Sequence, residues 1–168
     1  NYTTTLNGYD NVILLNPKQS DNGYYVETGW ATTSKNIDLP NSKSLWNIEG
    51  SNKLTPNSPV KLSWTNNQNI KFVKEISLDK QYLFNIKQTI INSSDKTYNF
   101  YPYGQIIRNV APDVTNFYIL HEGLIGVFDD QLVEEDYDDI EEKKYSKNAQ
   151  SGWLGIRSEE HTSELQSQ

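Results

Sequence analysis

The 168-residue chain contains no cysteine, no methionine and only two histidines. The absence of cysteine excludes disulfide bonds, thiol nucleophiles and thiolate metal sites. Two histidines leave too few parts for a histidine-rich zinc site, and serine-nucleophile chemistry is similarly short of a base. Because a complete gene product starts with Met, a chain that starts with Asn1 is expected to be an internal or processed piece of a longer protein.

Long hydrophobic runs are also missing. No stretch approaches the ~18 consecutive apolar residues of a membrane-spanning helix, and we expect no signal peptide. The net charge of -7 is concentrated between Asp129 and Lys144, where nine acidic residues face two lysines. A basic surface of the kind that binds nucleic acid is therefore absent, and no nucleic-acid partner is expected.

Alternating apolar and polar residues form the strongest pattern in the chain. The alternation runs through residues 60–64, 70–78 and 82–90, with turn-forming residues between the runs. Side chains of a strand point to opposite faces in turn, so the pattern predicts three strands of a half-buried antiparallel meander. Lys74 and Gln88 interrupt the apolar series, and we expect a strand end or a bulge to absorb them.

Shorter segments complete a predicted all-β fold, mainly antiparallel. Strands are expected within residues 12–15, 24–31, 44–49, 97–110, 117–120, 124–128 and 153–156. One short helix is expected near residues 135–146, where acids come first and lysines last, as the helix macrodipole favours. Trp46 is expected to pack against the sheet from the long loop that precedes the meander.

His121 is the main candidate for acid–base chemistry or metal binding. It lies at the end of a predicted strand, before a turn expected at Glu122-Gly123, which favours a structural role. The other histidine, His161, lies in a tail of different character. Residues 157–168 have no strand pattern and resemble the translation of a sequencing adapter. We therefore expect the native domain to occupy residues 1–156 and regard 157–168 as a non-native tail.

The acidic residues and the tryptophans offer two further kinds of site. A calcium loop needs oxygen ligands at alternate positions and a glycine at the sixth, and no register starting at Asp129, Asp130 or Asp136 supplies both. A solvated acidic helix face is favoured instead, and no metal or cofactor is expected. Trp30, Trp46 and Trp64 could stack on sugars, but most of the chain's aromatic residues fall on the alternating apolar face, which favours core packing.

An ordered series of short motifs resembles the periplasmic domain of the YidC membrane protein insertase family. The motifs span residues 14–156 and are Gly29-Trp30, Lys61-Leu62-Ser63-Trp64, Asn69-Ile70-Lys71-Phe72, Ile76-Ser77-Leu78-Asp79, Tyr82-Leu83-Phe84, Tyr103-Gly104, His121 through Val127, Tyr137-Asp138-Asp139-Ile140 and Gly152 through Ile156. Each motif is short, and the specificity comes from their order along nearly the whole chain.

This resemblance implies a β-super-sandwich, similar to sugar-mutarotase domains and incomplete at its C-terminus, that faces the periplasm from the bacterial inner membrane. The family accepts nascent membrane proteins, alone or with the Sec translocon, through a groove in a transmembrane bundle that lies outside this chain. It therefore implies no enzyme activity and no catalytic, cofactor or metal residue here. It also implies missing strands, which would leave a sheet edge or an apolar patch exposed.

Two alternatives remain open at the level of the sequence. The first is a carbohydrate-binding or mutarotase-like β-sandwich of the cell envelope. In a mutarotase, His121 would be the base, buried in a groove with a carboxylate within hydrogen-bond reach. The second alternative is an adhesive or lipoprotein β-domain.

Overall fold

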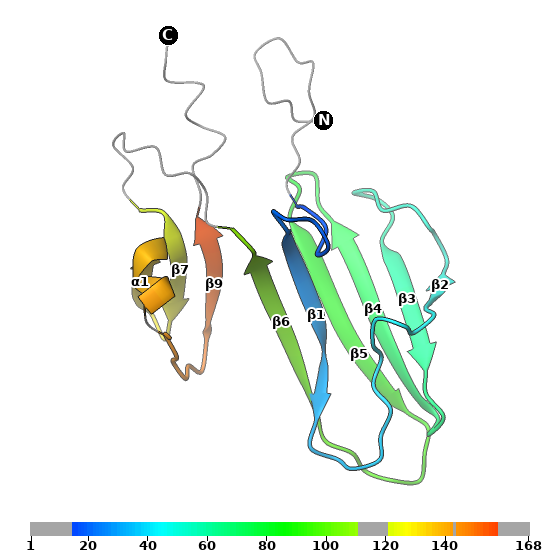
Figure 1. The fold of residues 1–168 in the computed structure, drawn as a ribbon. Coiled ribbons are helices and arrows are strands. Elements are labelled where there is room, and N and C mark those ends of the chain that lie inside the picture. Colours follow the sequence, from blue (N-terminus) through cyan, green and yellow to red (C-terminus); the bar gives the residue numbers. More distant parts are fainter. Residues whose placement is uncertain (1–14, 111–120, 143, 158–168) are drawn as a thin grey trace. The chain divides into compact units, whose positions relative to one another are not determined.

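The computed structural model describes residues 15–110, 121–142 and 144–157 (Figure 1). The chain divides into two compact units, one of residues 28–105 and one of the remaining described residues. The strand predicted at residues 117–120 and most of the one at 12–15 lie outside the described residues. Leu15, the last residue of that predicted buried strand, is exposed and belongs to no strand.

The described residues form nine strands and one short helix. In chain order these are β1 (Tyr24–Thr32), β2 (Asn47–Glu49), β3 (Val60–Thr65), β4 (Ile70–Leu78), β5 (Phe84–Asn92), β6 (Phe100–Arg108), β7 (Gly123–Phe128), β8 (Gln131–Asp136), α1 (Tyr137–Glu142) and β9 (Gly152–Arg157). No described helix has the length and apolar character needed to cross a bilayer.

The predicted meander is confirmed as the sheet of the unit of residues 28–105. Strands β2, β3, β4 and β5 pair in that order, and every neighbouring pair is antiparallel. The third strand begins at Phe84, so the expectation that Tyr82 belongs to it is wrong: Tyr82 lies in the turn with a φ of 65°. Phe84 and Ile86 were expected on a buried face but are exposed. They lie at the N-terminal end of β5, whereas Ile90, near its C-terminal end, packs against the core cluster.

Lys74 and Gln88 do not sit at a bulge or a strand end, contrary to the sequence-based expectation. They are direct cross-strand partners in the unbroken register of β4 and β5. Lys74 Nζ donates to the carbonyl oxygen of Thr28, and Gln88 Nε2 donates to that of Gly29 at 2.7 Å. The two polar side chains thus have hydrogen-bond partners in β1, and the pairing of β4 with β5 continues without a bulge.

The core of this unit is aromatic. Trp30 from β1 and Phe72 from β4 meet with ring centroids 5.2 Å apart, edge to face, and Ile70 is fully buried beside them. Burying each such side chain stabilises the fold by about 1.5–3 kcal/mol. Trp46 stacks on Trp30 at 6.4 Å, which confirms the predicted packing of the loop before β3.

Strands β1 and β6 pair with each other in a two-stranded sheet. Thr32 Oγ1 donates to Asn99 O at one end of this sheet at 2.6 Å, and Asn109 N donates to Gly23 O at the other at 2.8 Å. These bonds link the start of each strand to the end of its partner, so the strands are antiparallel.

The second unit contains the antiparallel sheet β8-β7-β9 and the helix α1. Strand β8 was not predicted. The predicted helix near residues 135–146 is confirmed but shorter, because residues 135 and 136 are the last two of β8 and the helix ends at Glu142. The backbone pairing with β7 holds these acidic residues extended despite their helix-compatible spacing. Consequently no lysine lies in the last turn of α1.

Gly123 fixes the start of β7. Its φ is 149°, and a Cβ atom there would lie 2.2 Å from the carbonyl oxygen of Glu135. Only glycine permits both this backbone conformation and this approach to β8. The glycine expected to form a turn after Glu122 therefore opens a strand.

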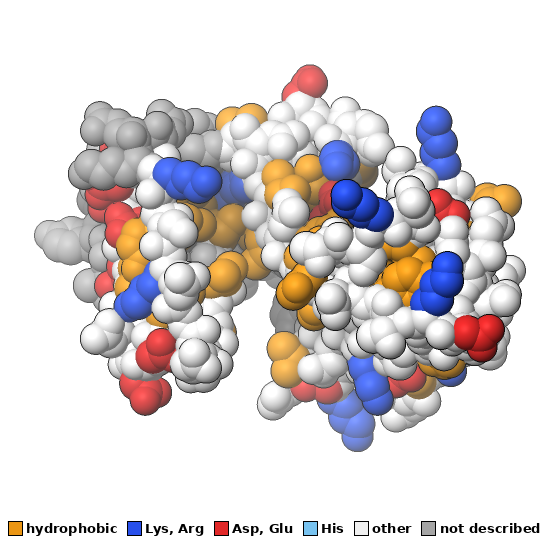
Figure 2. All heavy atoms as spheres, turned by 90° about the horizontal axis from the view of Figure 1, so that it is seen from below, with side chains coloured by type: hydrophobic (Ala, Val, Ile, Leu, Met, Phe, Trp, Pro, Cys, Tyr) orange, Lys and Arg blue, Asp and Glu red, His pale blue; other side chains and the backbone are white. Residues whose placement is uncertain are grey.

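The mainly antiparallel β fold with one short helix is confirmed, while the super-sandwich arrangement stays a prediction. Many apolar side chains reach the surface between polar ones, as one face of the molecule illustrates (Figure 2). Within the described residues, β9 pairs only with β7 and β5 only with β4, so both are edge strands.

Candidate functional site

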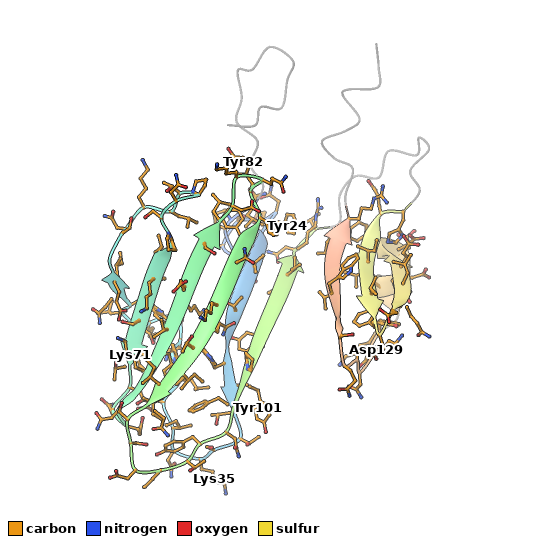
Figure 3. The ribbon with its side chains drawn as sticks, turned by 180° about the vertical axis from the view of Figure 1, so that it is seen from behind. Tyr24, Lys35, Lys71, Tyr82, Tyr101 and Asp129 are labelled. Carbon is orange, nitrogen blue, oxygen red and sulfur yellow. The ribbon has the colours of Figure 1, made fainter. Side chains whose placement is uncertain are left out.

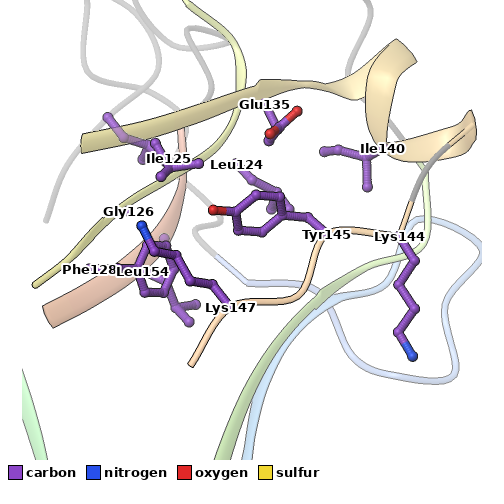
Figure 4. Close-up of a pocket in the computed structure, with 12 residues that line it drawn as sticks. Leu124, Ile125, Gly126, Phe128, Glu135, Ile140, Lys144, Tyr145, Lys147 and Leu154 are labelled. Carbon is purple, nitrogen blue, oxygen red and sulfur yellow. The ribbon is translucent and has the colours of Figure 1, made fainter. Parts of the chain in front are cut away.

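A cleft of about 650 Å³ lies on one face of the β8-β7-β9 sheet (Figure 4). The sheet supplies its floor, α1 and the segment after the helix supply its walls, and most lining side chains are apolar. Those used below are Leu124, Gly126, Phe128, Ile140, Tyr145 and Leu154. Alternate residues of β7 point to this face because strand side chains have a period of two.

Gly126 gives the floor of the cleft its depth. A Cβ atom at this position would lie 2.9 Å from the carbonyl oxygen of Trp153 and 3.0 Å from the ring of Phe128. The ring of Phe128 therefore occupies space that a side chain at 126 would fill. A glycine inside a strand marks a bulge or a close backbone approach, and Gly126 is a case of the second because β7 keeps its regular register through it.

Two residues after α1 bring polar groups to the cleft. The ring of Tyr145 lies across the middle of the view in Figure 4, 6.3 Å from that of Phe128. Lys147 Nζ lies 5.7 Å from the centroid of the Phe128 ring and donates to Gln131 Oε1 at 2.9 Å. Lys144 extends away from the centre. The cleft can hold an apolar group beside an amine and a hydroxyl, and these groups do not form an acid–base pair.

A second cavity of about 390 Å³ in the same unit shares Leu124 and Ile140 with the cleft and adds Tyr137. Burial raises the pKa of the Tyr137 hydroxyl above its ordinary value of 10.0, and the positive charge of Arg108 opposes that change. The hydroxyl lies 3.5 Å from the carbonyl oxygen of Arg157, to which it donates. Tyr137 thus stays protonated at neutral pH and connects α1 to β9.

His121 is buried with a carboxylate in reach, which is part of the geometry expected of a mutarotase base. Its Nδ1 lies 2.9 Å from Asp136 Oδ1, and its Nε2 lies 3.0 Å from the carbonyl oxygen of Leu124. Both ring nitrogens therefore face acceptors within the protein, and His121 lines neither cavity. The arrangement joins the start of β7 to the end of β8 and offers a substrate no ring nitrogen.

The acidic residues and tryptophans that the sequence offered as possible metal or sugar sites serve the fold in the structure. No group of three or more metal-ligating side chains occurs among the described residues. Asp129, a starting position at which the sequence already failed the pattern of a calcium loop, accepts hydrogen bonds from the backbone N–H groups of Gln150 and Ser151 at 2.8 and 3.0 Å. Trp30, Trp46 and Trp64 all belong to the core cluster or pack against it, as the favoured interpretation predicted.

The sequence patterns did not single out the cleft. Its walls come from β7, β8, β9, α1 and residues 144–147, which are brought together only by the sheet. The available signal was Gly126 inside an apolar strand, because glycine in a strand marks a bulge or a close approach. The contact that would complete the signal, the carbonyl oxygen of Trp153, cannot be identified without the pairing of β7 and β9.

Comparison with known proteins gives one consistent result. The family model described as the YidC periplasmic domain matches residues 1–159. The chain is 54% identical over 155 residues to the membrane protein insertase YidC of Pelagibacter ubique, covering 92% of this chain and 28% of that protein. The corresponding protein of Rickettsia prowazekii is 44% identical over 147 residues, covering 86% of this chain and 26% of that protein.

A third relative, the YidC insertase of Rickettsia felis, is 40% identical over 152 residues, which cover 89% of this chain and 27% of that protein. The chain thus spans about a quarter of the length of these curated relatives. No solved structure matches the chain.

Proposed function

Because the chain belongs to the YidC periplasmic domain family, we propose that it serves a longer inner-membrane protein that inserts nascent membrane proteins into the bilayer. The family is one of insertases and not of enzymes, and this domain faces the periplasm. The observation that carries the proposal is the family match over residues 1–159, supported by 54% identity to the Pelagibacter insertase.

The proposed substrates are the hydrophobic segments of nascent membrane proteins, received alone or together with the Sec translocon. The domain acts beside the membrane-embedded part of the full-length protein, which handles these segments. The geometry of His121 supports this role over a sugar-converting one, because both of its ring nitrogens are engaged by Asp136 and Leu124.

The test uses the full-length protein that contains this domain. It is expressed in a bacterium whose own insertase is depleted, and insertion of a membrane protein is measured by protease protection in membrane vesicles. We expect insertion to be restored, and His121→Gln to restore it equally at a temperature where the domain is folded. Failure of the full-length protein, under conditions where the Pelagibacter relative restores insertion, would overturn the proposal.

Participation of the Sec translocon is tested separately. A photoreactive residue is placed at exposed positions of this domain in the full-length protein, and irradiated membranes are probed for adducts with translocon subunits. Adducts that depend on the position of the label support the Sec partnership. Insertion that proceeds without any adduct at any position argues for the Sec-independent route.

A further inference from the structure

The two hairpin turns that flank β4 are built by the same device. In the first turn, between β3 and β4, the side-chain oxygen of Asn66 accepts hydrogen bonds from the backbone N–H groups of Gln68 and Ile70, both at 2.9 Å. Asn69 completes this turn in the left-handed region, with a φ of 60°. Asparagine adopts that region readily, so the turn uses residues that suit it.

The second turn, between β4 and β5, repeats the device with different residues. Asp79 Oδ1 accepts from the backbone N–H groups of Gln81 at 2.7 Å and Leu83 at 2.9 Å. The position of Asn69 is taken by Tyr82, with a φ of 65°. A bulky aromatic residue is an outlier there, and such strain persists only when the surrounding structure imposes it. Here, four hydrogen bonds between Asp79 and the other turn residues impose it.

This turn and the first residue of β5 present three consecutive large apolar side chains to solvent. The exposed fractions are 48% for Tyr82, 60% for Leu83 and 53% for Phe84. The first turn has only polar residues at its tip. Figure 3 shows Tyr82 at one end of the sheet and Lys71, next to the first turn, toward the other. A feature needed only to close a hairpin would not require the apolar tip, because the first turn closes without one.

We propose that Tyr82 and Leu83 of this turn, together with Phe84 at the start of β5, form a membrane-contacting tip that inserts into the interface of a phospholipid bilayer. Tyrosine prefers the headgroup level of a bilayer, where its ring is apolar and its hydroxyl is hydrated. Leucine and phenylalanine gain free energy when they enter the boundary of the acyl chains. This chemistry fits a lipid surface, and a domain of an inner-membrane protein works beside one.

The charges around the tip agree with a lipid surface. Lys80 is exposed at the turn and can place its amine among headgroup phosphates while its stem follows the apolar residues. The carboxylate of Asp79 is directed to the turn's own backbone. Farther along the hairpin, Glu75 is the direct cross-strand partner of Lys87, so their opposite charges offset each other.

The experiment exploits the absence of cysteine from the chain. Leu83→Cys in residues 1–168 carries a single environment-sensitive fluorophore and is mixed with vesicles of phosphatidylethanolamine and phosphatidylglycerol. We expect the emission to shift to the blue and to rise in intensity. Matched labels at Asn67→Cys in the first turn and at Leu45→Cys, an apolar position that is 88% exposed, should not respond. An equal response at all three positions would overturn the proposal.

A second variant separates lipid contact from folding. Tyr82→Asn places at this turn the residue that the first turn uses, so the midpoint of urea unfolding should stay the same or rise. Vesicle partitioning should fall several-fold, and by about tenfold or more when Leu83→Thr and Phe84→Thr are added. Unchanged partitioning of the triple variant would contradict the proposal. So would a fluorophore that responds only to vesicles carrying integral membrane proteins, since that result would assign the tip to a protein partner.

Discussion

Lys74 and Gln88 face each other across β4 and β5 and donate hydrogen bonds to the consecutive carbonyl groups of Thr28 and Gly29 in β1. The Lys74 amine also lies 5.5 Å from the ring centroid of Trp30, within cation–π range. A polar cross-strand pair thus binds the backbone of a third strand at the border of the aromatic core. In the sequence alone, Lys74 and Gln88 only interrupt a series of apolar residues, and nothing indicates that they contact a third strand.

Removing this pair should weaken the fold. Lys74→Met leaves the Thr28 carbonyl without its donor and removes the cation over Trp30, so the free energy of unfolding should fall by about 1–3 kcal/mol. Gln88→Leu should cost a similar amount, and the double variant should cost less than the sum because the side chains are neighbours. Urea unfolding followed by tryptophan fluorescence measures all three. Lys87→Met, on the exposed side of β5, is the control, and a loss as large as that of Lys74→Met would argue against the assignment.

The stability of the β2-β3-β4 region should depend on pH through Glu49. Its carboxylate lies 2.6 Å from Lys71 Nζ and 3.1 Å from Lys61 Nζ. Hydrogen bonds from Lys71, Ser63 and Lys61 lower the pKa of Glu49 from 4.5 to about 2. A carboxylate whose pKa is lower in the folded chain stabilises it above pH 4.5 and loses this contribution as the pH falls toward 2.

Glu49→Gln should therefore unfold at lower urea concentration than the parent at pH 7. The two midpoints should converge between pH 4.5 and 2, and 1 M salt should narrow the difference at pH 7 because these groups are partly exposed. A difference that persists unchanged at pH 2 would mean that the amide disturbs the site for another reason.

Gly123 and Gly155 make a matched test within one sheet. Gly123→Ala places a Cβ atom against the Glu135 carbonyl in a backbone conformation that alanine rarely adopts, so a loss of about 3 kcal/mol or more is expected. A Cβ atom at Gly155 meets nothing within 4 Å. Gly155→Ala should be neutral or stabilise the chain by up to about 1 kcal/mol. Chemical denaturation of both variants decides the matter, and equal effects would count against the described register of β7 and β8.

His121 should matter for stability rather than for chemistry. His121→Phe removes the ring nitrogens that contact the part-buried Leu124 carbonyl and the Asp136 carboxylate, and a loss of about 1–3 kcal/mol is expected. Asp136→Asn should cost less than about 1 kcal/mol, because that side chain is largely exposed. Hydrogen exchange of the β7 and β8 amides should localise both effects. A larger effect of Asp136→Asn would contradict the dominance of the carbonyl contact.

The sequence predicts those elements whose conformation depends on neighbouring residues, and it fails where the conformation depends on contacts between distant segments. Strands β3 and β4 were predicted because apolar and polar residues alternate along each of them, and this alternation is visible within a few residues of sequence. Strand β8 was missed because Glu134, Glu135 and Asp136 have low strand propensity, and only pairing with β7 holds them extended. Tyr82 was assigned to a strand because its left-handed conformation depends on the hydrogen bonds of Asp79.

The sites were harder to predict from the sequence than the strands, because they depend on contacts between segments that are distant in the chain. The break at Asp79 was read as a turn, but its residues carry no sign that the turn repeats the one at Asn66. The partner of His121, Asp136, lies 15 positions away and reaches it only through the β7–β8 register. Family resemblance reached the function because it compares ordered motifs over the whole chain and needs no contact map.

The position of β9 at the border of its sheet has a practical consequence. Within the described residues, β9 pairs with no strand other than β7, and Trp153 and Leu154 project exposed apolar surface from it. A second molecule can pair its own β9 with such a border through main-chain hydrogen bonds, and the pair is then closed because each molecule has used its one β9. Concentrated preparations of the isolated domain should consequently dimerise through β9, and Leu154→Lys is the simplest way to keep the molecules apart.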